Sequence, residues 1–242
     1  MRRLDVTDVH KSYGDHPAVR GVSLHAEAGE ILAVLGRNGA GKTTLIGMMA
    51  GRHQPDSGSI MVDELDLATD RKEAALRIGY VPQETGLYEF LPGRDTLSFF
   101  GELAGLHGAT LRERIDWAVD LFHLGEFIDR PCEHLSGGQR RRIHAAAGIL
   151  HRPELLLLDE PTVGADLESR ADILEAVRTL AEAGTAVIYT THYLPEVEQL
   201  EARIAIMEAG EVVAEGEQDA LVATHGAPWV ELTFDGAAPV PK

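Results

Sequence analysis

The segment 36–43 constrains the fold of this chain more than any other part. It reads Gly-Arg-Asn-Gly-Ala-Gly-Lys-Thr and matches the pattern G-x-x-x-x-G-K-[ST] of a phosphate-binding loop, or P-loop. In such a loop the backbone N–H groups surround phosphate oxygens, the lysine adds a cation, and the final hydroxyl can bind Mg²⁺. The residues expected to contact a nucleotide here are Gly36, Asn38, Gly39, Ala40, Gly41, Lys42, Thr43 and Thr44.

The segments on either side of the P-loop support this interpretation. The apolar run 31–35 predicts a buried parallel strand, and 44–50 predicts a helix whose N-terminus faces the anion. A glycine-rich turn that binds nothing is the alternative, but it does not account for both flanks.

A second strand is predicted to end in two carboxylates. Four leucines at 155–158 are followed by Asp159 and Glu160. Two carboxylates directly after a buried strand are costly unless they meet a cation or act as a base, although a solvated turn is the simpler alternative. We expect Asp159 to hold Mg²⁺ through its water shell. Glu160 is expected to point to the opposite side of the extended chain, where it could polarise an attacking water.

The motif Leu-Ser-Gly-Gly-Gln at 135–139 supplies a third element. Ser136 can cap a helix, the two glycines allow close backbone approach, and the spacing of apolar residues through Leu150 predicts an amphipathic helix. An ordinary serine-capped helix would explain this motif if it stood alone.

Taken together, these three elements resemble the ATP-binding cassette (ABC) family, from about residue 4 to about residue 216. In that family the third motif is the signature, which contacts the γ-phosphate of ATP held by a partner subunit. The resemblance therefore implies nucleotide-binding roles for Ser136, Gly137, Gly138 and Gln139.

The resemblance implies roles for four more residues. Tyr13 corresponds to the aromatic that stacks on adenine, Gln83 to the glutamine that touches Mg²⁺ and water, and His192 to the switch histidine at the γ-phosphate. Asp166 corresponds to the aspartate that couples the two sites of a dimer. A strand-end tyrosine, a polar loop residue and a strand-end histidine are the simpler alternatives for the first three, but the matches occur in the correct order.

The composition limits the partners that the chain can bind and the cellular compartment in which we expect it. The chain has 242 residues and a formal net charge of −17, which opposes nucleic acid binding, and the basic triplet 140–142 is expected to be a solvated helix face. The single cysteine, Cys132, cannot form an internal disulfide, which fits a reducing cytoplasm. No apolar segment follows Met1–Asp5, and no run approaches the ~20 residues that cross a bilayer, so we expect the chain neither to enter nor to span a membrane by itself.

The fold class expected is α/β. The resemblance implies a P-loop ABC ATPase core with a mixed sheet and flanking helices, an N-terminal antiparallel β region, and a helical subdomain inserted at about 84–133. No internal repeat of cassette length is present, so we expect one nucleotide-binding domain at 1–228 and a short C-terminal extension at 229–242 that is flexible at its end.

A single cassette leaves its site unfinished, so two copies should sandwich two ATP molecules, with Mg²⁺, head to tail. The stretches 79–88, 161–166 and 190–196 look most like the ATPase subunits of bacterial ABC-2 exporters of drugs or lipids. The resemblance thus implies an ATP-hydrolysing subunit that energises a membrane permease, as a cytoplasmic protein on the inner face of the cell membrane.

Two other functions stay open. Soluble ABC ATPases of DNA repair, ribosomes or cluster assembly share the nucleotide motifs, but repair members insert long coiled coils and ribosome-acting members carry two cassettes, and neither feature is seen here. A non-hydrolysing regulatory module is opposed by the presence of Glu160 and His192.

The chain departs from the family pattern at several positions. Ala165 and Leu167 flank Asp166 and could loosen the coupling between sites. Ala202 replaces an aspartate that would anchor the last β region, and Asp63-Glu64 replaces a turn glycine, which is expected to affect stability more than chemistry.

Overall fold

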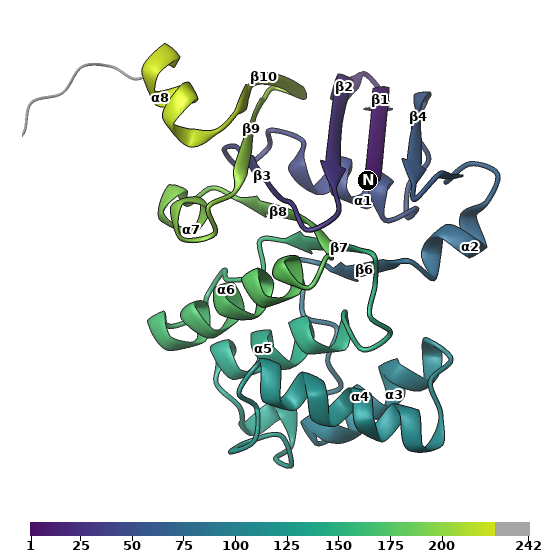
Figure 1. Ribbon diagram of the computed structural model, residues 1–242, viewed down its shortest axis with the longest axis vertical. Coiled ribbons are helices and arrows are strands. Elements are labelled where there is room, and N and C mark those ends of the chain that lie inside the picture. Colours follow the sequence, from purple (N-terminus) through teal and green to yellow (C-terminus); the bar gives the residue numbers. More distant parts are fainter. Residues whose placement is uncertain (226–242) are drawn as a thin grey trace, which may run out of the picture.

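The computed structural model describes residues 1–225, which form two β-sheets and the helices that cover them (Figure 1). The first sheet is antiparallel, with the strand order β2-β1-β4-β5. Its strands are β1 Arg2–Tyr13, β2 His16–Glu27, β4 Ser57–Val62 and β5 Leu65–Asp66. It corresponds to the N-terminal antiparallel region expected from the sequence, and its strands β1 and β2 are each 12 residues long.

The second sheet is mixed and has six strands in the order β10-β9-β3-β8-β7-β6. The pairs from β9 to β6 are parallel, and β10 joins β9 in an antiparallel pair through the turn at Ala209-Gly210. The strands are β3 Ile31–Leu35, β6 Ile78–Val81, β7 Leu155–Asp159, β8 Ala186–Thr191, β9 Arg203–Glu208 and β10 Glu211–Gly216. The predicted α/β class is confirmed.

The central sheet separates two hydrophobic cores, because successive side chains of a strand point to opposite faces. In β7, Leu155 and Leu157 join α1 and the first sheet in one core, whereas Leu156 and Leu158 join the helices in the other. All four are buried. A continuous apolar run is the pattern of a strand covered on both faces, and this explains why β7 carries four leucines in succession.

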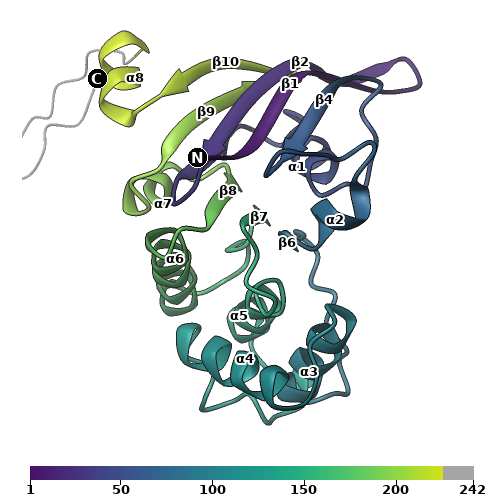
Figure 2. The same cartoon turned by 45° about the vertical axis from the view of Figure 1, so that its right-hand side comes forward.

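Helices α3, α4, α5 and α6 form a layer on the side of the central sheet opposite the antiparallel sheet, whereas α1 packs between the two sheets (Figure 2). Helices α3 and α4 lie within the segment 84–133 for which the sequence predicted a helical subdomain. The helices are α1 Lys42–Met49, α2 Arg71–Ala75, α3 Gly93–Leu103, α4 Gly108–Leu121, α5 Gly137–Ala147, α6 Leu167–Glu182, α7 Leu194–Gln199 and α8 Gln218–His225, with a 3₁₀ turn at Cys132–His134.

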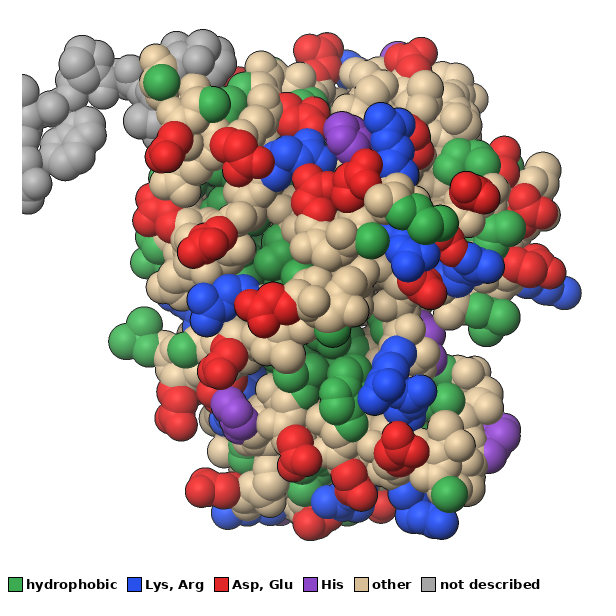
Figure 3. Space-filling model, viewed as in Figure 1, with side chains coloured by type: hydrophobic (Ala, Val, Ile, Leu, Met, Phe, Trp, Pro, Cys, Tyr) green, Lys and Arg blue, Asp and Glu red, His purple; other side chains and the backbone are tan. Residues whose placement is uncertain are grey.

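The predicted domain end at 228 and the extension 229–242 lie outside the described residues. Within residues 1–225, the helices are all too short or too polar to cross a bilayer. On the face shown in Figure 3, acidic and basic side chains are interspersed.

The basic triplet is not the solvated helix face that we predicted. Arg142 is buried, pairs with Asp172 and lies 4.8 Å above the ring of Phe127. Arg141 is half-buried and donates to the Val163 carbonyl oxygen at 3.1 Å. The prediction failed because α5 packs between α3 and α6, so two of its three arginines face other elements.

Two departures from the family pattern are compensated by other residues. Arg203 pairs with Glu30 and Glu215, so these carboxylates anchor the last β region without an aspartate at position 202. Asp63 has a positive φ of 48°, as the turn between β4 and β5 requires, and its carboxylate pairs with Arg3 at 2.7 Å and with Arg77.

His144 makes the stability of the fold dependent on pH. Burial, together with the nearby charge of Arg141, lowers the pKa of His144 from its ordinary value of 6.5 to about 4. The folded state therefore resists protonation of His144, and neutral His144 contributes to the free energy of unfolding. This contribution is complete above the unfolded-state pKa and is lost as the pH falls from about 6.5 towards about 4. Replacing the imidazole removes this titration.

We expect wild-type protein to lose roughly 2 kcal/mol more unfolding free energy than a His144→Gln variant between pH 7 and pH 5. Urea denaturation of both proteins at the two pH values measures the difference. Equal losses would show that His144 does not titrate in this interval.

Candidate functional site

The P-loop joins the carboxyl end of β3 to the N-terminus of α1, and its backbone is shaped by glycine. Gly41 has a φ of 104°, and a Cβ there would collide with the carbonyl oxygen of Ala18, so no other residue fits without strain. Lys42 follows as the first residue of α1, and its side chain is only 4% exposed. Its Nζ donates to the carbonyl oxygens of Gly36 at 2.8 Å and Arg37 at 3.3 Å, which holds the ammonium group inside the loop.

Three residues from separate segments converge on the carboxylate of Glu160. Lys42 Nζ lies 3.1 Å from Oε1, Gln83 Nε2 donates to Oε2 at 3.4 Å, and His192 Nδ1 lies 3.5 Å from Oε2. The sequence predicted a catalytic role for Glu160, Gln83 and His192 separately. The fold brings them together because β6, β7 and β8 are parallel neighbours, so the residues after them meet at one edge of the sheet.

The backbone at Glu160 differs from the expected extended chain. β7 ends at Asp159, and Glu160 has a φ of 47°, in the left-handed region. Its N–H donates to Thr190 Oγ1 at 3.0 Å, which holds this unusual conformation. A left-handed backbone is uncommon for a residue with a side chain and often marks a functional position.

Asp159 is 1% exposed, and only one of its carboxylate oxygens has a hydrogen-bond partner among the described residues. Thr190 Oγ1 donates to Oδ1 at 2.7 Å, and Oδ2 is left without a partner. Burial raises the pKa of Asp159, while hydrogen bonds from Thr190 and Thr43 and the charge of Lys42 oppose this rise. A buried acceptor without a donor is costly, so this carboxylate is suited to a cation or its water shell.

A pocket of about 360 Å³ lies against these groups. Tyr13 lines this pocket and is 49% exposed, so its ring is available for stacking. The predicted nucleotide contacts that line this pocket are Tyr13, Asn38, Gly39, Gly41, Lys42, Thr43 and Thr44, and the predicted catalytic residues Gln83 and Glu160 line it too.

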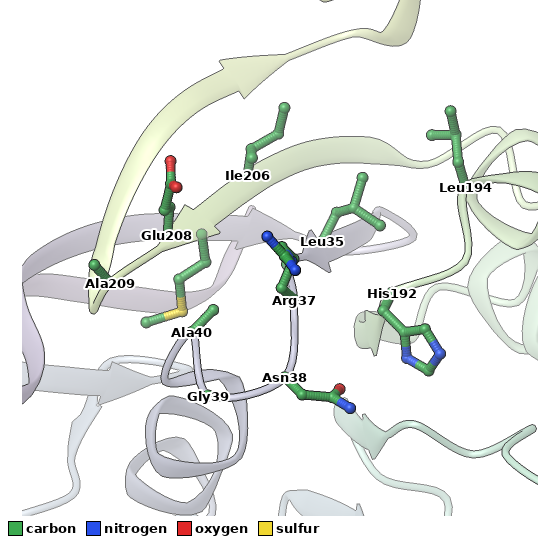
Figure 4. Close-up of a pocket in the computed structure, with 12 residues that line it drawn as sticks. Leu35, Arg37, Asn38, Gly39, Ala40, His192, Leu194, Ile206, Glu208 and Ala209 are labelled. Carbon is green, nitrogen blue, oxygen red and sulfur yellow. The ribbon is translucent and has the colours of Figure 1, made fainter.

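A second pocket of about 570 Å³ lies on another side of the same loop and includes Gly36 and Ala40 (Figure 4). Figure 4 shows Arg37 projecting from the P-loop among the apolar side chains of Leu35 and Ile206. Asn38 and Gly39 line both pockets, whereas the predicted site residues Gly36, Ala40 and His192 line only this second one.

The signature residues lie elsewhere. Ser136 caps α5 in a reciprocal arrangement, since Gln139 N–H donates to its Oγ at 3.1 Å and its own N–H donates to Gln139 Oε1 at 3.0 Å. Gly138 packs so closely on Ser169 of α6 that a Cβ would collide with that side chain. None of residues 136–139 lines either pocket beside the P-loop.

Asp166 lies beside the signature loop. It caps α6 by accepting from Ser169 N–H at 2.8 Å, and this hydrogen bond lowers its pKa. The signature loop and the segment 164–169 therefore form one surface, away from the P-loop of the same chain.

Two residues near the site were not predicted from the sequence. Arg141 donates to the carbonyl oxygens of Gln83 and Val163 and so ties the signature helix to two loops. Glu196 is buried beneath the strand end that carries His192. A carboxylate four residues after His192, on a short helix, was the only local signal for the second.

The chain matches the protein-family model described as "ABC transporter" over residues 19–163. It is 42% identical to the linearmycin resistance ATP-binding protein LnrL of Bacillus subtilis (strain 168), over 81% of this chain and 63% of that protein. It is 40% identical to the daunorubicin resistance ATP-binding protein DrrA3 of Streptomyces coeruleorubidus, over 81% of this chain and 62% of that protein. The chain thus spans less than two thirds of the length of these two relatives.

A solved structure shows the same fold. The dimeric structure of a post-hydrolysis state of the ATP-binding cassette MJ0796 bound to ADP and Pi matches 88% of this chain and 98% of that chain, with a TM-score of 0.80 and 25% sequence identity. The resemblance inferred from the sequence motifs is confirmed: this chain belongs to the ABC transporter family.

Proposed function

We propose that this chain binds and hydrolyses ATP, and that two copies use the hydrolysis to energise export through a membrane partner. The observation that carries the proposal is the convergence of Lys42, Gln83 and His192 on Glu160 beside the P-loop. A carboxylate placed at the edge of a phosphate pocket can orient and deprotonate a water molecule.

Each residue of the site in one chain has its own role in binding or hydrolysing ATP. Tyr13 stacks on the base, the P-loop amides and Lys42 hold the phosphates, and Glu160 acts as the base for the attacking water. His192 and Gln83 lie near enough to Glu160 to orient its carboxylate and the γ-phosphate. The Lys42–Glu160 contact of 3.1 Å must loosen when phosphate oxygens reach the ammonium group.

Mg²⁺ fits the donor set at this site. The unpartnered Oδ2 of Asp159 and the hydroxyl of Thr43 supply hard oxygen ligands, and Gln83 adds an amide oxygen. When bound, the cation would neutralise charge on the β- and γ-phosphates. Asp159 is positioned for this by the hydrogen bond from Thr190.

Two copies are needed because one chain leaves the site open. Ser136, Gly137, Gly138 and Gln139 lie away from the P-loop of their own chain, so we propose that they complete the nucleotide site of a second copy. Asp166 lies against Gly138 and caps α6 beside the signature residues, and this supports the proposal that it couples the two sites. The dimeric cassette with ADP and Pi among the similar structures supports this arrangement.

The proposed membrane partner is a permease, which would place the chain at the inner face of the cell membrane. The names of the relatives describe resistance to linearmycin and daunorubicin, which supports an exporter for this chain. The segment that follows Gln83 exposes apolar side chains at Tyr88, Phe90, Leu91 and Phe99, which are 49%, 78%, 38% and 37% exposed, and the rings of Tyr88 and Phe99 are in contact. We propose that this aromatic surface receives a helix of the permease.

Replacing both Tyr88 and Phe90 with serine should abolish copurification with the permease and leave ATP hydrolysis unchanged. The fold should survive, because both side chains are exposed and the main loss is the edge-to-face contact of Tyr88 with Phe99, worth about 1 kcal/mol. Affinity purification from detergent-solubilised membranes, with an ATPase assay on the isolated subunit, measures both effects.

The matched control is a double variant, Leu76→Ser with Val213→Ser, at apolar positions that are 70% and 53% exposed elsewhere. It should copurify as wild type does. Loss of the permease from both double variants would place the docking surface elsewhere.

The same purification tests the alternative of a soluble ABC ATPase. Mass spectrometry of the copurifying material should identify a polytopic membrane protein. Ribosomal or DNA-repair proteins in its place would favour the alternative.

A further inference from the structure

A buried carboxylate outside the nucleotide pocket joins several elements of the site. Glu196, in the first turn of α7, is 3% exposed. Its Oε1 accepts from Thr162 Oγ1 at 2.6 Å, and its Oε2 accepts from Tyr189 OH at 3.0 Å and from Thr191 Oγ1 at 2.8 Å. Arg170 Nε lies 3.3 Å from Oε1 and supplies the opposite charge. A buried carboxylate with this many partners fixes the groups around it in one arrangement.

One side of this network holds the backbone at His192. Thr191 directly precedes His192, and its Oγ1 both donates to Glu196 and accepts from Tyr193 N–H at 3.0 Å. The Thr191 hydroxyl group therefore links the peptide unit that follows His192 to the carboxylate of Glu196. This matters because the His192 side chain is 51% exposed, so packing does not set its direction, and yet its Nδ1 lies 3.5 Å from Glu160.

The other side of the network holds the loop that leaves Glu160. Thr162 is two residues after Glu160, and its carbonyl oxygen accepts from Ala165 N–H at 3.0 Å, which shapes the turn leading to Asp166. Arg170 is in the first turns of α6, the helix that Asp166 caps. Glu196 thus connects the segment that carries Glu160 and Asp166 with the strand end that carries His192.

We propose that Glu196 is a positioning residue for ATP hydrolysis. It keeps His192 within reach of Glu160 by fixing the end of β8 against the loop after β7. The inference rests on the proposed roles of Glu160 and His192. If Glu196 only docked α7 onto the fold, its replacement would lower stability without changing turnover.

The test is Glu196→Gln, which keeps the volume of the side chain but removes its charge and one acceptor. We expect kcat to fall about 10-fold and KM for ATP to stay within about 2-fold, since Glu196 does not line the nucleotide pocket. The matched control is Glu198→Gln, an exposed carboxylate on the same helix, which should leave both constants unchanged. A lower midpoint of thermal unfolding with unchanged kcat would overturn the proposal.

A double variant tests whether Glu196 acts through His192. We expect His192→Ala to lower kcat, and we expect Glu196→Gln to lower it by no more than about 2-fold further in that background. A full additional 10-fold loss would refute this route. An unchanged kcat in His192→Ala alone would instead overturn the proposed role of His192, and the inference with it.

If Glu196→Gln does not fold, Thr191→Val makes the same test, because it removes only the hydroxyl that joins Glu196 to the backbone beside His192. The expected result is again a lower kcat at an unchanged KM, and unchanged turnover would count against the proposal.

Discussion

Glu160→Gln is expected to lower kcat for ATP hydrolysis by roughly 10²-fold or more while ATP binding is retained, as for the loss of a general base. Glutamine has nearly the same size, so the contacts with Gln83 and His192 can re-form in part. The amide cannot accept a proton from water. It also removes the negative charge beside Lys42, which leaves the ammonium group free for phosphate oxygens.

An ATP-dependent dimer should accumulate as a consequence, since hydrolysis is the step that separates the two copies. Size-exclusion chromatography of Glu160→Gln with and without ATP should show the dimer only when ATP is present. Glu182→Gln, at an exposed position at the end of α6, is the control and should hydrolyse ATP normally. Normal hydrolysis by Glu160→Gln, or a monomer that binds ATP, would refute the assignment of the base.

Lys42→Ala should weaken nucleotide binding by at least about 100-fold in each chain, because charge-assisted hydrogen bonds to phosphate are among the stronger polar contacts. The side chain is 4% exposed and the carbonyl oxygens of Gly36 and Arg37 hold its ammonium group inside the loop, so its removal takes a preorganised cation away from the phosphates. Equilibrium titration with a fluorescent ATP analogue measures the loss. Binding within a few-fold of wild type would contradict the assigned role of the loop.

Ser136→Ala provides the complementary variant. It should leave ATP binding by the monomer nearly unchanged and reduce turnover, since Ser136 is proposed to act across the dimer. The structure adds a second effect, because Ser136 caps α5 and its loss costs about 1 kcal/mol of stability. Ser136→Asp separates the two effects. It retains the cap but places a negative charge towards the partner's phosphates, so it should be stable and nearly inactive.

Mixing the Lys42→Ala and Ser136→Ala chains tests the composite site directly. A mixed dimer has one site with both defects and one site with neither, so partial activity should return. A mixture as inactive as each parent would mean that both sites must act together or that the trans arrangement is wrong.

Crosslinking distinguishes these two outcomes. Cysteines at Asn38 and Ser136 should crosslink between chains in the presence of ATP, and the native Cys132 is buried and should not compete. Asn38 is a better position than Gly39, whose φ of 82° disfavours any side chain. Failure to crosslink while dimers are present would reject the trans arrangement.

The sequence alone determined the parts of this protein that depend on neighbouring residues. The P-loop, its strand and helix, the two carboxylates at the end of β7, and the serine cap of α5 were predicted from consecutive residues, and the structure has each of these elements. Such features are set by local backbone preferences and side-chain spacing, which a sequence displays directly.

Tertiary structure alone decided which side chains meet. The contact of Lys42, Gln83 and His192 with Glu160 depends on strand order in the central sheet, and the left-handed backbone of Glu160 depends on Thr190 in a neighbouring strand. The burial of Arg142 depends in the same way on the helices around α5.

The network around Glu196 is the clearest case. Its partners come from the loop after β7, from α6 and from β8, and each is an ordinary threonine, tyrosine or arginine in the sequence. A hydrogen bond or ion pair forms only when two groups are within about 3 to 4 Å of each other. For residues many positions apart, that distance is set by the packing of the whole chain and by no local pattern.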